Sequence, residues 1–201
     1  MTDAVRALVR ASAAIGADGD VADALRDAQH HAEPLAIEEM ILQSYLFAGY
    51  PRALQAMVAW REVSGRAAPA GPTEDRGEWR ARGERICARV YAGQYQRLRS
   101  NVARLHPDLE RWMLEEGYGK VLGRPGLDLA ARELCIVALL AVQAAPVQLH
   151  SHLRGALNAG AAAEDVAAAL AVAASVAPGP AAVAAGLWAE VRERRVQRRE
   201  G

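Results

Sequence analysis

The sequence predicts an all-α protein, and three observations lead to this fold class. Apolar residues recur at the spacing of an amphipathic helix through most of the 201 residues. No segment shows the strict alternation of apolar and polar residues that is typical of a half-buried strand. Valine and isoleucine occur among alanine, leucine and charged residues, and these neighbours favour helix over strand.

The periodic segments are bounded by recognisable start and stop signals. Asp20 and Asp128 stand where an N-cap carboxylate is expected, and Pro107 fits the first turn of a helix. Gly160, which follows Asn158, indicates a helix stop. The expected helices span residues 3–15, 20–32, 36–48, 51–64, 76–104 with a break near Gly93 left open, 107–117, 128–142, 147–159, 163–175 and 180–197.

Composition and charge argue against several classes of protein. The formal net charge is zero, so no surplus of basic residues favours nucleic acid or an anionic membrane as a partner. The most apolar segment, residues 134–149, is too short to span a bilayer and is expected to form a buried core helix. The N-terminus lacks the apolar stretch of a secretory signal. The two cysteines, Cys87 and Cys135, lie far apart in the sequence and predict reduced thiols in a cytoplasmic protein.

The two halves of the chain look related, and this predicts an internal repeat. Residues 64–75 (SGRAAPAGPTED) are rich in Gly, Pro and small residues and form the expected linker. The residues that match between the halves are Arg6 with Arg132, Leu8 with Leu134, Val21 with Val147 and Glu38 with Glu164 at an offset of 126, then Trp60 with Trp188, Glu62 with Glu190 and Val63 with Val191 at an offset of 128. We expect a degenerate first repeat (1–66), a linker with connecting helices (67–122) and a second repeat that carries the site (123–201).

Candidate chemistry gathers on two successive predicted helices of the second half. The first carries Glu133 near its start and is otherwise apolar through Val142. On the second, Gln148 and His152 are four residues apart and share one margin of an apolar stripe. If the two helices form a hairpin, His152 can approach the first helix.

This segment resembles the superfamily of carboxymuconolactone decarboxylases and alkylhydroperoxidase D-like proteins. The latter carry a glutamate, eleven residues, a cysteine, two residues, a second cysteine, three residues and a histidine. Glu133 and His152 stand at the two ends of that spacing, but Ala145 and Gln148 take the places of the cysteines. The segments GRPGLDLAARE (123–133), HLRGALNAGAAAEDV (152–166) and IEEMILQSYLFAGYPRALQAM (37–57) are also similar to parts of the superfamily domain.

The resemblance implies an alkylhydroperoxidase D-like helical fold and a cofactor-free lyase-type enzyme without a metal. Its substrate would be a small carboxylated lactone or keto acid. His152 would be the general acid/base, because an imidazole titrates near neutrality, and Glu133 would orient it. In the repeat alignment Ala7 takes the place of Glu133 and Arg26 that of His152, so we expect one site per chain.

Four further residues are substrate-binding candidates under the same resemblance. Arg124 or Arg132 would hold the acid group by a bidentate contact, Gln148 would hydrogen-bond a carbonyl, and Tyr118 would line the pocket. Each candidate also has a structural interpretation. His152 could be a hydrogen-bonded core histidine, and Arg132 could pair with a neighbouring acid.

Two alternative functions stay open at this stage. The first is a thiol-dependent alkylhydroperoxidase or peroxiredoxin-type antioxidant activity that uses Cys135. The second is a non-catalytic oligomer that binds a small metabolite. The family resemblance implies a homo-oligomer, a trimer or larger, with residues 163–175 and the apolar positions of 39–58 as candidate packing faces.

Overall fold

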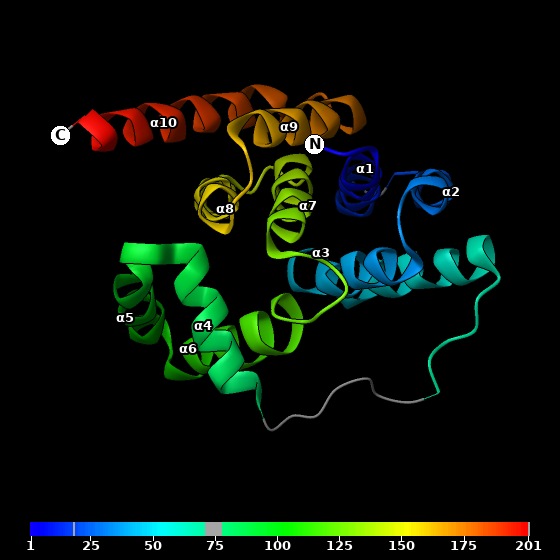
Figure 1. The fold of residues 1–201 in the computed structure, drawn as a ribbon, viewed down its shortest axis with the longest axis horizontal. Helices are drawn as coiled ribbons and strands as arrows, with labels where there is room; N and C mark the ends of the chain where they lie inside the picture. The colour runs from blue at the N-terminus through cyan, green and yellow to red at the C-terminus, as the bar shows by residue number, and fades with distance from the viewer. Residues whose placement is uncertain (18, 71–77, 201) are drawn as a thin grey trace.

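The computed structural model describes residues 1–17, 19–70 and 78–200, and these residues contain helices and turns but no strand (Figure 1). The predicted all-α fold class is confirmed. The helices are α1 (Asp3–Ala17), α2 (Val21–His31), α3 (Pro34–Ser64), α4 (Trp79–Tyr91), η2 (Ala92–Gln94), α5 (Tyr95–Leu105), α6 (Pro107–Trp112), η3 (Met113–Leu122), α7 (Leu129–Val142), α8 (Pro146–Ala159), α9 (Ala163–Val176) and α10 (Ala181–Glu200).

The local signals placed several helix ends correctly. The Asp20 carboxylate accepts a hydrogen bond from the backbone N–H of Asp23 at the start of α2, and Asp128 caps α7 through the N–H of Ala131. Gly160 ends α8 in the left-handed conformation with φ 110°, which glycine adopts without a Cβ clash.

One expected helix boundary differs from the structure, whereas two expected breaks are present. The break expected between the helices at 36–48 and 51–64 is present, because the backbone inside α3 is non-helical at Gly49 (φ 81°), just before Pro51. The helix expected at 107–117 is the short α6 followed by a π-helix, η3, which runs to Leu122. The break near Gly93 is present as the 3₁₀ turn η2, whereas the expected helix start at residue 76 and linker residues 71–75 lie outside the described residues.

Helices α8, α7, α1 and α2 follow one another across the middle of the molecule (Figure 1). Helices α9 and α10 cover one side of this row, and α3 together with the α4–α6 segment covers the other. Helix α7 packs against α1, α8 and α9, and every one of its residues except Ala130 is buried. A helix enclosed in this way needs apolar residues all round, which explains the apolar run in the sequence.

The α4–α6 segment is held together by a close crossing of α4 and η3. A Cβ added at Gly83 would overlap the carbonyl oxygen of Leu114, and one added at Gly119 would overlap that of Trp79. The two backbones can therefore approach because both positions are glycine. This crossing sets the depth at which η3 places Tyr118, which is 4% exposed.

Candidate active site

The structure brings Glu133 and His152 together. The short turn 143–145 joins α7 to α8, and the two helices pack against each other. The Nδ1 atom of His152 lies 2.8 Å from Oε2 of Glu133. Glu133 is fully buried and His152 is 6% exposed, so the contact is screened from water and stronger than a surface pair.

The pair has the geometry of an imidazole oriented by a carboxylate. A proton on Nδ1 donated to Glu133 leaves Nε2 as the ring nitrogen that can exchange a proton with another molecule. The ring of Phe47, on α3, meets the imidazole edge-to-face at a centroid distance of 5.3 Å. The other carboxylate oxygen of Glu133, Oε1, is buried and has no hydrogen-bond partner among the described residues.

Gly155, one turn after His152 on α8, makes room for the Glu133 carboxylate. A Cβ at this position would lie 2.7 Å from Oε2 of Glu133 and 2.9 Å from Cγ1 of Val90. Only a residue without a side chain therefore fits between α8 and the carboxylate. Sequence reasoning missed this requirement, although a glycine at i+3 from His152 inside a helix was a signal for it.

Tyr118 and Tyr91 form a phenol pair beside the carboxylate. Their rings meet edge-to-face at 6.2 Å and their side chains are hydrogen-bonded. Burial raises the pKa of Tyr91 to about 12 and that of Tyr118 well above its usual range, and the charge of Glu133 acts in the same direction. Both phenols thus stay protonated as hydrogen-bond donors. Tyr118 was a sequence candidate, whereas Tyr91 was missed because it lies outside the resembling segment.

Arg124 and Arg132 lie in an ion-pair network and not beside His152. The Arg124 guanidinium contacts both carboxylate oxygens of Glu39 at 2.9–3.0 Å, and Nη2 of Arg132 lies 2.8 Å from Oε2 of the same residue. Arg132 and Gln43 also contact each other, at 3.3 Å. Arg132 is 0% exposed and Glu39 2%. Arg132 therefore makes the contact that its structural interpretation expects, an ion pair with a neighbouring acid.

Gln148 is directed to solvent, and the two thiols are enclosed in the core. Gln148 is exposed on α8. Cys87 and Cys135 are both free and buried. Burial raises the pKa of each thiol to about 12, so neither is a thiolate near neutral pH.

Two surface cavities formed by the described residues are lined by neither Glu133 nor His152. One, of about 230 Å³, lies between α8, α10 and the turn after α4, and Tyr91 is one of its lining residues. The other, of about 250 Å³, lies between α1, α2 and α9. At 0% and 6% exposure, Glu133 and His152 are covered by protein in the single chain.

Among the residues that the structure describes, no three His, Cys, Asp or Glu side chains are grouped so that they could hold a metal ion. In the same part of the chain, no helix is both long enough and apolar enough to cross a membrane.

Comparison with known proteins agrees with the resemblance. The model of the carboxymuconolactone decarboxylase family matches residues 107–191, from the start of α6 into α10, and so includes both Glu133 and His152. Residues 107–191 form a carboxymuconolactone decarboxylase family domain. The expected family is thereby confirmed, and the pair lies inside the carboxymuconolactone decarboxylase domain.

A curated protein also matches the chain, at low sequence identity. The chain is 29% identical to Peroxisomal protein 2 of Schizosaccharomyces pombe (strain 972 / ATCC 24843) over 154 residues, which is 70% of each chain. The match is longer than the carboxymuconolactone decarboxylase domain itself, so homology extends into helices outside it.

The Gly155→Ala variant should lose about 1–3 kcal/mol of unfolding free energy, because the added methyl group overlaps the Glu133 carboxylate. In the double variant Gly155→Ala/Glu133→Ala the overlap with the carboxylate is gone, so the two losses should not add. Urea denaturation of the wild type, both single variants and the double variant measures this coupling. Strictly additive losses would contradict the close contact.

Both thiols should be unreactive in the folded chain. At mildly alkaline pH, a chromogenic disulfide reagent should react with neither Cys87 nor Cys135, because a thiol with a pKa of about 12 supplies almost no thiolate. In denaturant both should react. Rapid reaction of either thiol in the native protein would show that burial does not protect it.

Proposed function

We propose that this protein is a cofactor-free acid/base enzyme of lyase type that acts on a small carboxylated lactone or keto acid. His152 is the group that transfers the proton, and Glu133 orients it. One observation carries the proposal: a fully buried carboxylate lies 2.8 Å from Nδ1 of a nearly buried imidazole. The carboxymuconolactone decarboxylase domain around the pair supports the same class of chemistry.

The proposed reaction needs an electron sink and a proton donor. When the carboxylate departs as carbon dioxide, the electrons of the broken carbon–carbon bond move to the neighbouring carbonyl and give an enolate. Protonated Nε2 of His152 then returns a proton to the carbon; water restores the proton to the imidazole, and the hydroxide that remains combines with carbon dioxide as bicarbonate. Glu133 stabilises the imidazolium form through Nδ1–H, in surroundings of low effective dielectric.

Other residues have narrower roles in this proposal. Tyr118 and Tyr91 are protonated donors close to Glu133, and Phe47 limits the space around the imidazole. Arg124 and Arg132 are left out of the proposed site, because Glu39 binds both guanidinium groups. Gln148 is left out because it is exposed.

The two alternatives fare differently. A peroxidase that uses Cys135 is disfavoured, because the thiol is fully buried with a pKa of about 12 and attack on a peroxide needs a thiolate. The second candidate function is non-catalytic metabolite binding. It is favoured by the 6% exposure of His152 and by the absence of the pair from both cavities.

We also propose that the chain contains two divergent repeats. Helix α1 spans 3–17 and, moved by 126 positions, covers 129–143, where α7 spans 129–142. When the residue numbers of α2 (21–31) are raised by the same 126 positions they become 147–157, and this range lies within α8 (146–159). The Gly49 kink of α3 corresponds to the break between α9 and α10.

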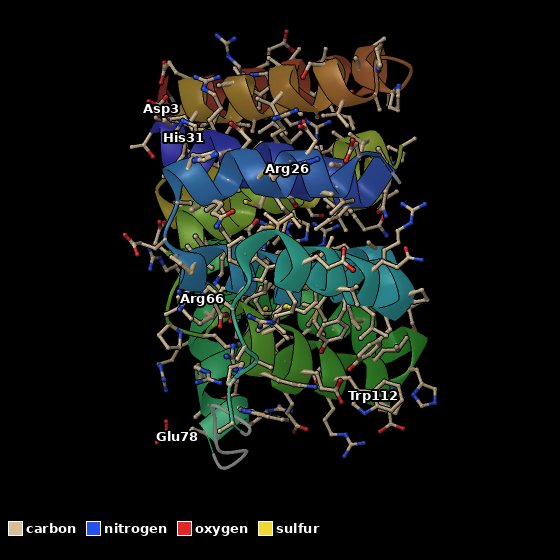
Figure 2. All side chains as sticks on the ribbon, turned by 90° about the vertical axis from the view of Figure 1, so that its right-hand side faces the viewer. Asp3, Arg26, His31, Arg66, Glu78 and Trp112 are labelled. Atoms are coloured by element: carbon tan, nitrogen blue, oxygen red, sulfur yellow. The ribbon has the colours of Figure 1, made fainter. Side chains whose placement is uncertain are left out.

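The site would then exist only in the second repeat. Ala7, buried at 3% exposure, takes the place of Glu133. Arg26, in the place of His152, is exposed on the outer side of α2 (Figure 2). A carboxylate–imidazole pair cannot form from these two residues, so this proposal gives one acid/base site per chain.

The His152→Asn variant should lose about 10²–10⁴-fold in turnover, the usual contribution of a general acid/base. Glu133→Gln should also lose activity, because an amide stabilises the imidazolium less well than a carboxylate. The assay follows carbon dioxide release from a panel of small carboxylated lactones and keto acids. His30→Asn, an exposed histidine at the end of α2, is the matched control. Full activity of a folded His152→Asn variant would remove the proposed role, and no turnover by the wild type on any panel member would favour metabolite binding.

A homo-oligomer, a trimer or larger, is proposed as the working state. Tyr50, Leu54 and Val58 lie four residues apart on the second half of α3, and all three are exposed, as in a helix face that packs against another chain.

Light scattering should give a mass of at least three chains. Leu54→Glu should lower that mass, whereas Gln55→Glu, at an exposed polar position of the same helix, serves as the charge-change control. A monomeric wild type would contradict the proposal.

A further inference from the structure

The cavity between α8, α10 and the turn after α4 has a cationic lining. Arg154 and His150 face it from α8, and Arg194 and Arg195 face it from α10, with no Asp or Glu among its lining residues in the described part of the chain. Figure 1 shows the C-terminal half of α10 above α8 and the end of α4 below it. Three guanidinium groups and an imidazole on two helices therefore share one hollow.

The rest of the lining is partly apolar. Tyr91, Leu157 and Val191 contribute ring and aliphatic surface. The wall between α4 and α8 is fixed by two hydrogen bonds, from Asn158 to the carbonyl of Val90 at 2.9 Å and from Arg89 to that of Ala159 at 2.8 Å. The volume of about 230 Å³ is below the roughly 300–1,000 Å³ of drug-sized ligand sites, so it suits a small metabolite.

The electrostatics of the cavity favour a negative ligand. The pKa of His150 is lowered, first by desolvation and then by the charges of Arg154 and Arg194, while Glu190 opposes the shift. Glu190 lies 3.6 Å from Arg194, and both side chains are more than half exposed, so this pair is weak. Cations that repel one another in a partly desolvated hollow are relieved by an anion.

We propose that this cavity is a binding site for a small organic carboxylate with an apolar body. The carboxylate contacts the guanidinium groups of Arg194, Arg195 and Arg154, for which bidentate geometry is available. The apolar body lies against Leu157, Val191 and the ring of Tyr91. The site is separate from Glu133 and His152, neither of which lines the cavity, and it does not depend on the proposed catalytic function.

Calorimetric titration of the full chain with benzoate tests the proposal. Benzoate should bind, whereas benzamide, which has the same shape without the charge, should not. Arg194→Gln/Arg195→Gln should raise the Kd for benzoate by at least about fivefold, since hydrogen bonds to charged groups contribute that much or more. Arg192→Gln, on the same helix but outside the cavity lining, is the matched control and should leave the Kd unchanged. Circular dichroism verifies that each variant is folded.

Four results would overturn the proposal. They are no binding of benzoate at millimolar concentration, equal binding of benzamide, an equal loss in Arg192→Gln, and inorganic phosphate binding as tightly as benzoate. The His152→Asn variant separates this site from the acid–imidazole pair. Unchanged benzoate binding in that variant supports the cavity, whereas loss of binding there, with retention in Arg194→Gln/Arg195→Gln, places the ligand at His152 and refutes it.

Discussion

Two adjacent buried charges on α7 determine how the centre of the molecule is assembled. Arg132 and Glu133 are both 0% exposed, and buried charges are tolerated only when they are paired. Successive residues of a helix point about 100° apart, so the two pairs lie on different sides of α7. Arg132 binds Glu39 on α3, and Glu133 binds His152 on α8. Together they fix the rotation of α7 between its neighbours, which apolar packing alone would leave less well determined.

Small residues make both pairs possible. Gly155 leaves space for the Glu133 carboxylate on α8. On the side that faces α3, Gly126 has φ 91°, and a Cβ there would lie 3.1 Å from Cγ of Glu39 and 2.8 Å from Cγ of Leu35. The turn before α7 can therefore carry Arg124 onto Glu39, as its bidentate contact requires. Each of these two buried contacts thus depends on a nearby glycine that no charge pattern in the sequence would identify.

Structural features that depend on residues close together in the sequence were predictable, whereas contacts between residues far apart in the sequence were missed. Helix ends at Asp20, Asp128 and Gly160 follow from local capping, so they were predictable. The approach of His152 to Glu133 was predicted on the condition that the two helices form a hairpin. A separation of 19 positions with a short turn between the helices permits this hairpin. Glu39 is 93 positions from Arg132, and Tyr91 reaches Tyr118 only through the α4–η3 crossing. Such contacts depend on how whole layers pack, which periodicity does not reveal.

The two halves of the chain contribute unequally to the candidate site. The carboxymuconolactone decarboxylase domain begins at residue 107 and supplies Glu133, His152 and Tyr118. Residues before it complete the surroundings: Glu39 binds the arginine next to Glu133, and Phe47 lies against the imidazole. In the proposed repeat Ala7 and Arg26 take the places of the pair and cannot form one, yet residues before 107 shape the pair in the second half. Such dependence gives a physical reason for keeping both halves in one chain, because the isolated domain would leave Arg132 without its carboxylate and His152 without the ring of Phe47.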